Sequence, residues 1–118
     1  MKLRLTVNDR TVMARVIDSP TARDFVSLLP LTLTLSDLFR REKVGQLPRT
    51  ISHEGKRTHS YALGDIAYWS PGPDVSFFYR HDGERIPDPG NIVIGKIGSG
   101  IEALNVPGSV KVTMELVK

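Results

Sequence analysis

Few residues in this sequence have the types and spacing that catalysis or metal binding needs. Three histidines are present: His53 and His59 lie six residues apart in a polar stretch, and His81 lies in a later turn. This spacing matches no helical or finger-type zinc motif. Ser52, His53 and Asp65 have the residue types of a nucleophile, a base and an orienting acid, but no nucleophile-elbow motif accompanies them. We therefore expect loop histidines in solvent and no metal.

Two further classes of chemistry are excluded by composition and by motif. The chain has no cysteine, which rules out disulfides, a thiolate nucleophile and cysteine-based metal sites. The glycine-rich run GKIGSG, residues 95–100, lacks the order of strand, GxxxxGKS or GxxxxGKT, and helix that makes a phosphate-binding loop. Bulges and turns explain its glycines. The sequence predicts no cofactor.

Charge is scattered along the chain. The net charge is +3 with a pI near 9.4, and no basic run is longer than a pair such as Arg40-Arg41. We expect residues 40–43 and the pair Lys56-Arg57 to be solvated surface. A basic balance of this size permits nucleic acid as a partner without implying it.

Length and hydropathy indicate one globular domain. The 118 residues, 13.1 kDa, are 40% hydrophobic, so we expect a single core and one domain over residues 1–118. No apolar run approaches the roughly 20 residues that span a bilayer, and the first ten residues alternate where a signal peptide would be continuously apolar. We expect a cytoplasmic protein with no membrane partner. The sequence predicts no oligomeric state.

Hydrophobic periodicity predicts strands and one helix in the first third of the chain. Residues 3–7 and 12–16 alternate on either side of the turn Asn8-Asp9, which is typical of a hairpin with one buried face. Ser19 can cap a helix and Pro20 suits its first position. Apolar residues then recur at 22, 25, 26 and 29 until Pro30 ends the helix. Residues 31–35 alternate again and predict a strand.

The remaining residues predict strands and loops. Strands are expected over 43–47, 66–69, 75–80, 92–97 and 110–116, a helical turn over 101–104 and a long surface loop over 48–62. With the three earlier strands, the total is eight strands and one clear helix. Eight strands can close into a barrel that side chains fill, which removes exposed sheet edges. We expect a mainly β fold, a closed eight-stranded β-barrel, with a sandwich as the alternative.

Aromatic side chains gather around the two prolines of residues 64–83. Phe77 and Phe78 are adjacent on a strand, so they face opposite sides: one belongs to the core, and the other belongs to the core or to a cleft wall. Trp69 is either a packing lid or a binding residue. We expect the hydroxyls of Tyr68 and Tyr79 to reach solvent at strand ends.

Three segments, in order along the chain, resemble the cyclophilins. They are PTARDFVSL (20–28), similar to the first helix of that family; GDIA (64–67) with GPD (72–74) and SFF (76–78); and NIVIGKI (91–97) followed by Gly100 and Leu104. The motifs PTARDF, LPLTL, EKVG, LP and GDIAY also resemble a short prokaryotic cyclophilin-like group of uncharacterised function.

This resemblance implies a barrel with helices at its ends and a peptide cleft on its outer face. It places the cleft beside Trp69, Ser70, Ser76, Phe78, Ile86 and Asn91. Prolyl isomerisation crosses a barrier of roughly 18 to 20 kcal/mol that arises from amide resonance. A cyclophilin-like protein would lower this barrier by holding the proline in an apolar pocket while an arginine donates a hydrogen bond to the twisted amide.

The functional residues of the family are matched only in part. Phe78 matches the pocket phenylalanine, whereas Ser76, Ile86 and Asn91 stand at or near the positions where glutamine, tryptophan and histidine are expected. We therefore expect the fold to be kept and efficient isomerase activity to be lost or weak.

Three functions follow as hypotheses. The first is a binding module for a proline-containing peptide or a small molecule. The second is an active isomerase that uses Arg40 or Arg41 as its donor, because the arginine-bearing segment of the family has no match here. The third is a basic barrel that stacks single-stranded nucleic acid on Tyr68, Trp69 and Tyr79, with an affinity that falls steeply as salt rises.

Overall fold

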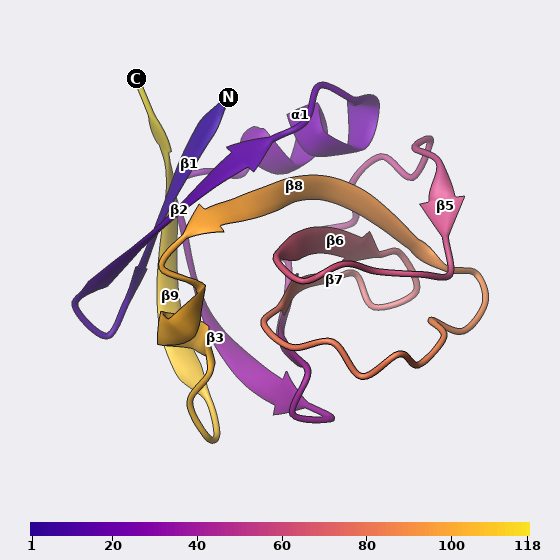
Figure 1. Cartoon of the computed structure of the whole chain (residues 1–118). Coiled ribbons are helices and arrows are strands. Elements are labelled where there is room, and N and C mark those ends of the chain that lie inside the picture. The colour runs from indigo at the N-terminus through magenta and orange to yellow at the C-terminus, as the bar shows by residue number, and fades with distance from the viewer.

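The computed structural model describes residues 1–118 as one antiparallel sheet with two short helices (Figure 1). The helices are α1 (Pro20–Val26) and the 3-10 turn η1 (Ile101–Leu104). The strands are β1 (Lys2–Val7), β2 (Arg10–Val16), β3 (Leu31–Leu38), β4 (Glu42–Gln46), β5 (Arg57–Thr58), β6 (Asp65–Trp69), β7 (Asp74–Phe78), β8 (Asn91–Ser99) and β9 (Val110–Val117). No helix is long and apolar enough to cross a membrane.

The sheet closes on itself and confirms the predicted eight-stranded barrel. Its hydrogen-bonded order is β2-β1-β9-β3-β4-β7-β6-β8, and a further pairing of β2 with β8 completes the ring. The ninth strand, β5, pairs with β8 outside this ring. Because each strand of the ring has two neighbours, the barrel exposes no long unpaired edge.

The first hairpin and the helix form as their sequences predict. Asn8 and Asp9 have φ angles of 47° and 66°, the left-handed pair that a two-residue hairpin turn needs. Ser19 caps α1 by accepting a hydrogen bond from the Ala22 backbone N–H at 3.1 Å. Phe25 is fully buried under the helix, which lies along β8 at one end of the barrel (Figure 1).

Several predicted boundaries were wrong, two of them because local hydrogen bonding ends an element earlier than its periodic pattern does. The helix ends at Val26, before Pro30, because the backbone N–H groups of Leu28 and Leu29 bond to the carbonyls three residues back and not to those four residues back. Strand β7 ends at Phe78, two residues early, because the N–H groups of Tyr79 and Arg80 both donate to the Arg41 carbonyl. The expected loop 48–62 contains β5, and β8 continues through Gly98 to Ser99.

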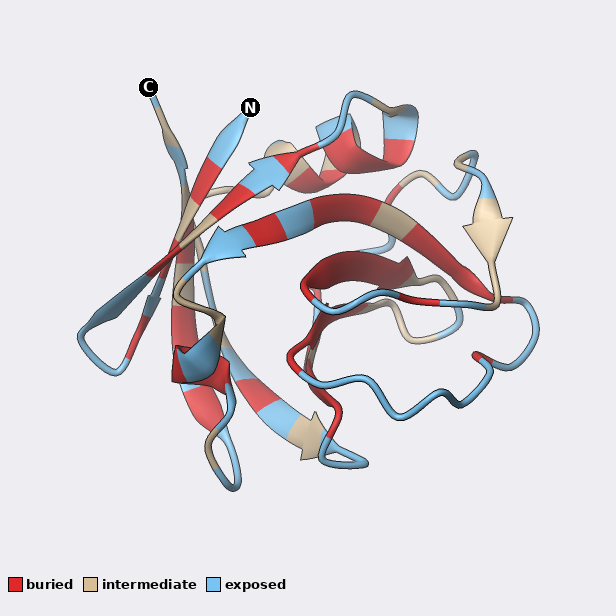
Figure 2. Cartoon of the chain, viewed as in Figure 1, coloured by how far each residue is buried: buried red, intermediate tan, exposed pale blue.

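Two hydrophobic clusters lie on opposite sides of the barrel wall. The larger one contains 24 buried residues and fills the barrel interior, where the inner faces of the strands meet (Figure 2). The smaller one lies on the outer face of β6 and β7 and consists of Tyr61, Ala67, Phe78 and Ile86. Phe77 belongs to the first and Phe78 to the second, so the strand alternation gives these two adjacent rings different cores.

A buried lysine ties β4 to one end of the barrel. Lys43 pairs with Phe77 across the β4–β7 ladder, so its side chain points inward, and it is fully buried. Its ammonium donates to Asp37 Oδ1 at 3.0 Å and to the carbonyls of Val106 and Gly108 at 2.6 Å each. Tyr79 donates its hydroxyl to the same Asp37 carboxylate. All three ammonium donors therefore have partners, as a buried charge requires.

Replacing this lysine should destabilise the barrel strongly. Lys43→Met keeps the apolar stem but leaves the Asp37 carboxylate without its cation and the Val106 and Gly108 carbonyls without their donor. We expect the free energy of unfolding in urea to fall by about 3–5 kcal/mol. Lys96→Met is the matched control, because Lys96 is half exposed and its ion pair with Asp65 at 3.2 Å contributes less than about 1 kcal/mol. Equal losses in the two variants would contradict this role for Lys43.

Candidate functional site

Strand register places a set of side chains together on the outer face of the barrel. In the β4–β7 ladder Val44 pairs with Ser76, and in the β6–β7 ladder Trp69 pairs with Asp74. Tyr68 pairs with Ile92 of β8, which places Asn91 beside Trp69. These residues alternate with inward-facing neighbours, so they share one face of four adjacent strands.

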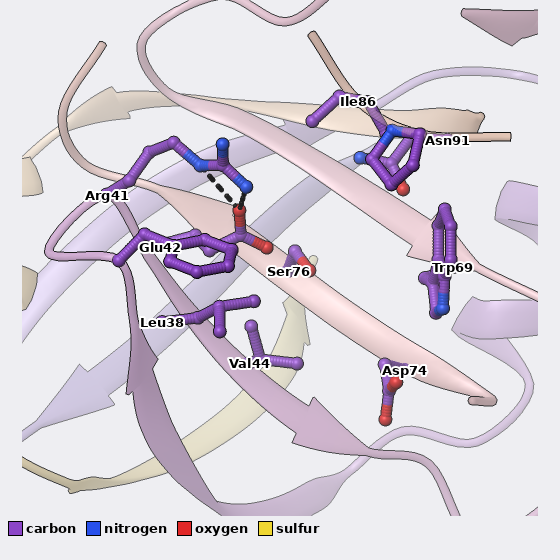
Figure 3. Close-up of a pocket in the computed structure, with 11 residues that line it drawn as sticks. Leu38, Arg41, Glu42, Val44, Trp69, Asp74, Ser76, Ile86 and Asn91 are labelled. Carbon is purple, nitrogen blue, oxygen red and sulfur yellow. Dashed lines mark hydrogen bonds and ion pairs between the residues drawn. The ribbon is translucent and has the colours of Figure 1, made fainter. Parts of the chain in front are cut away.

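A pocket of about 240 Å³ lies over this face, and we call it the outer-face pocket (Figure 3). Its volume is slightly below the range of about 300–1,000 Å³ that is usual for small-molecule sites. The β3–β4 turn forms one wall, and the segment before β8 forms another. Eleven residues line it: Leu38, Phe39, Arg41, Glu42, Val44, Trp69, Asp74, Ser76, Ile86, Pro87 and Asn91.

Of the six residues expected in the cleft, the structure places Trp69, Ser76, Ile86 and Asn91 in the lining of this pocket. Ser70 and Phe78 do not line it. Ser70 lies one residue beyond the end of β6, and the Phe78 ring is fully buried.

Phe78 is covered by an aromatic ring that sequence analysis did not assign. Tyr61 stacks on Phe78 with ring centroids 4.5 Å apart and an interplanar angle of 23°. His81 packs against the Tyr61 ring at the same centroid distance. Phe78 therefore packs under the Tyr61 ring and does not itself line the pocket.

The two candidate arginines occupy different places. Arg40 is exposed in the β3–β4 turn, where it has a φ angle of 52°, and it does not line the pocket. Arg41 lines the pocket and is buried, with only 6% of the residue exposed. The expectation that residues 41–43 are solvated surface was wrong, because Glu42 and Lys43 are buried as well.

The Arg41 guanidinium is enclosed by aromatic rings and carboxylates. It lies 5.2 Å from the ring centroids of Phe39 and Tyr61 and 5.6 Å from that of Phe78. Its Nε donates to Glu42 Oε2 at 2.8 Å and its Nη2 donates to the same oxygen (Figure 3). Its Nη1 lies 3.6 Å from Asp82 Oδ2. Rings cover its faces and carboxylates occupy its edges, so the group is held by the protein itself.

Comparison with known proteins agrees with this architecture. The model of the cyclophilin-like family matches residues 5–115. The chain belongs to the cyclophilin-like family. Among solved structures, this cyclophilin-like barrel is similar to the solution structure of a hypothetical protein from Archaeoglobus fulgidus, with 24% sequence identity and a TM-score of 0.76. The alignment covers 98% of this chain and 93% of the other, and it shows the shared fold. The chain matches none of the curated proteins.

Two carboxyl groups of the outer-face pocket, those of Glu42 and Asp74, lie in surroundings that are unfavourable for a negative charge. Burial raises the pKa of Glu42, although the hydrogen bond from Arg41 lowers it in part. Burial alone raises the pKa of Asp74. Asp82, on the far side of Arg41, has its pKa lowered by the hydrogen bond from the Tyr61 hydroxyl. The charge of Arg41 is thus shared by two carboxylates, and that of Asp74 is not balanced.

The remaining polar candidates lie outside the pocket and apart from one another. His59 Nε2 lies 2.7 Å from Asp88, and His81 Nε2 lies 3.1 Å from the Tyr61 carbonyl, so these two histidines have protein partners. Asp65 pairs with Lys96, and the Ser52 backbone N–H bonds to Asp24. No hydrogen bond or ion pair joins Ser52, His53 and Asp65, so the structure gives no support to a catalytic set of these residues.

The two tyrosines expected at solvent are buried. Tyr68 is 1% exposed, and its hydroxyl accepts a hydrogen bond from the Ile51 backbone N–H at 3.2 Å. Tyr79 is also buried and donates to Asp37; burial, together with that bond, raises the pKa of Tyr79 to about 12. Neither ring can stack on a ligand at the surface.

Six residues of the pocket lining were not predicted from the sequence: Leu38, Phe39, Glu42, Val44, Asp74 and Pro87. For Glu42 and Val44 a signal existed, because alternation over residues 42–46 puts both on the face opposite Lys43. Asp74 could have been paired with Trp69 across the intervening turn. Phe39 gave no signal, because its φ of 58° is a conformation that a phenylalanine rarely adopts.

The raised pKa of Glu42 predicts a specific pH dependence. We expect its carboxyl carbon to titrate in ¹³C NMR with a midpoint above the ordinary 4.5. Since the folded chain then holds this proton more tightly than the unfolded chain, the contribution of Glu42 to the free energy of unfolding decreases as pH rises from the ordinary to the raised pKa. Glu42→Gln should remove that decrease. A midpoint at or below 4.5 would contradict the burial argument.

Proposed function

We propose that this cyclophilin-like protein binds a proline-containing peptide or a small molecule in the outer-face pocket, with prolyl isomerase activity lost or weak. The observation that carries the proposal is the state of Arg41: it lies in the pocket, but its guanidinium is bound by Glu42 and faces Asp82. The family fold and the pocket support ligand binding. The hydrogen bonds that Arg41 makes to Glu42 argue against its use as a donor to a substrate.

The composition of the pocket supports binding. Its walls are largely apolar, with Leu38, Val44, Trp69 and Ile86 around a floor that carries the Ser76 hydroxyl. An apolar pocket with a few convergent polar groups is the usual form of a small-ligand site. A proline ring or a compact organic molecule matches its volume of about 240 Å³.

The electrostatics of the pocket do not support efficient isomerisation. The reaction needs a donor aimed at the substrate amide as it twists, and that donor must be free at the moment of reaction. Arg41 donates its Nε–H and an Nη2–H to Glu42, and its Nη1 lies 3.6 Å from Asp82, so turning the guanidinium toward a substrate amide would strand the buried Glu42 carboxylate. Arg40 lies outside the pocket lining.

Two of the three rings expected to stack on single-stranded nucleic acid are not exposed. Tyr68 and Tyr79 are buried, so Trp69 is the one ring of the three that lies at the pocket surface. Binding to single strands depends on successive bases stacking on several exposed rings.

The proposal is tested by exchange NMR on a short Ala-Pro peptide with catalytic amounts of the protein. We expect peptide addition to shift the Trp69 indole N–H and the amides of Ser76 and Asn91, while the cis/trans exchange rate stays at its uncatalysed value. Trp69→Ala should weaken peptide binding by about tenfold, because it removes the main aromatic wall. Absence of any shift on peptide addition would refute binding of a proline-containing peptide and leave only the small-molecule form of the proposal.

Paired arginine variants separate a binding protein from an enzyme. If exchange is accelerated, and if Arg41→Ala abolishes the acceleration while Arg40→Ala does not, the protein is an isomerase and the proposal is wrong. Arg40→Ala is a matched control, since it removes the same charge from the adjacent exposed position. Thermal unfolding of both variants shows whether Arg41→Ala remains folded.

A further inference from the structure

One carboxylate of the outer-face pocket has no partner within the protein. Asp74 takes part in no ion pair or side-chain hydrogen bond, and burial is the one influence that shifts its pKa. Its carboxylate lies over Gly72, where a Cβ atom would come within 1.9 Å of Oδ2. Glycine at position 72 therefore gives the acid the space that it occupies at the edge of the pocket.

An aromatic ring stands directly across from this acid. Trp69 and Asp74 are partners in the β6–β7 ladder, which puts their Cβ atoms roughly 5 Å apart on the same face. Figure 3 shows both side chains on the same side of the pocket, away from Arg41. A ring face beside a carboxylate is the pairing that recognises organic cations, because the ring quadrupole and the acid both attract positive charge.

An amide that opens into the pocket lies next to them. Asn91 lines the pocket and is 4% exposed, and its side-chain amide has no hydrogen-bond partner among the other residues. The amide oxygen and nitrogen are not enclosed by the protein, so both can be reached from the pocket. The carbonyl of this amide is a second acceptor that a ligand with N–H donors would satisfy.

The cation already present in the pocket does not balance Asp74. Arg41 is bound to Glu42 and faces Asp82, which lies outside the pocket lining. Val44 and Ser76 lie between the two ends of the pocket (Figure 3). The Trp69 end is therefore negative in a protein whose net charge is +3.

From the unpaired Asp74, the neighbouring Trp69 ring and the Asn91 amide that opens into the pocket, we infer that this end of the pocket binds the protonated amine of an organic ligand. The inference rests on the proposed function, and it adds that the ligand carries a positive charge. The ammonium group would lie against the indole face and donate hydrogen bonds to the Asp74 carboxylate and the Asn91 carbonyl, while its apolar body faces Val44 and Ile86.

Three probes of matched size and different charge test this inference at neutral pH: benzylamine, benzyl alcohol and benzoate. Each is titrated into the full chain while the Trp69 indole N–H is followed by NMR. We expect benzylamine to bind about fivefold more tightly than benzyl alcohol, and benzoate to bind most weakly. Benzyl alcohol or benzoate binding as tightly as benzylamine would overturn the inference, as would benzylamine leaving the indole unshifted.

Two charge-matched variants locate the effect. Asp74→Asn should bring benzylamine down to the affinity of benzyl alcohol, whereas Asp9→Asn, which makes the same change in the distant β1–β2 turn, should leave the preference intact. An unchanged preference in Asp74→Asn would also overturn the inference. The Ala-Pro titration decides the proposed function separately: peptide binding without a preference for benzylamine refutes the cation site alone.

Discussion

The structure depends on how the sheet accommodates three consecutive charged residues, Arg41, Glu42 and Lys43, that are all buried. Strand alternation sends Lys43 into the barrel, where it holds Asp37 and the loop before β9, and sends Glu42 outward. Glu42 in turn fixes Arg41 among three aromatic rings. Burying a charge without such partners would cost several kcal/mol per group. These three residues can therefore be buried only because each charged side chain has a partner of opposite charge.

That constraint also shapes the pocket. The ion pair that satisfies Arg41 fills one end and removes the donor that an isomerase would need, while the apolar wall from Val44 to Ile86 stays open. At the other end Asp74 has no such compensation. One end of this barrel face therefore has its charge satisfied within the protein and the other does not, and this difference supports the proposed binding function over the proposed alternative of an active isomerase.

The sequence was informative where a property is local. Alternation, the Asn8-Asp9 turn and the Ser19 cap predicted the barrel strands, a hairpin and the helix, because each depends on neighbouring residues. The sequence was misleading where the partners of a residue are distant along the chain. Residues 41–43 look like solvated surface because Asp82, the partner of Arg41, lies 41 positions further along, and Val106, a partner of Lys43, lies 63 positions further along. Four of the residues that line the pocket were predicted through family resemblance, whereas Asp74 was not predicted, although pairing the two strands across their turn would have placed it opposite Trp69.

The central claim is that Arg41 is held by the protein and is not available to a substrate. Hydrogen exchange of arginine Nε–H groups, measured by ¹⁵N NMR with and without saturating Ala-Pro peptide, tests it most directly. The account predicts an Arg41 Nε–H that exchanges far more slowly than that of exposed Arg40 and that does not move when the peptide binds. An Arg41 signal that exchanges as fast as that of Arg40, or that shifts on peptide binding, would contradict it.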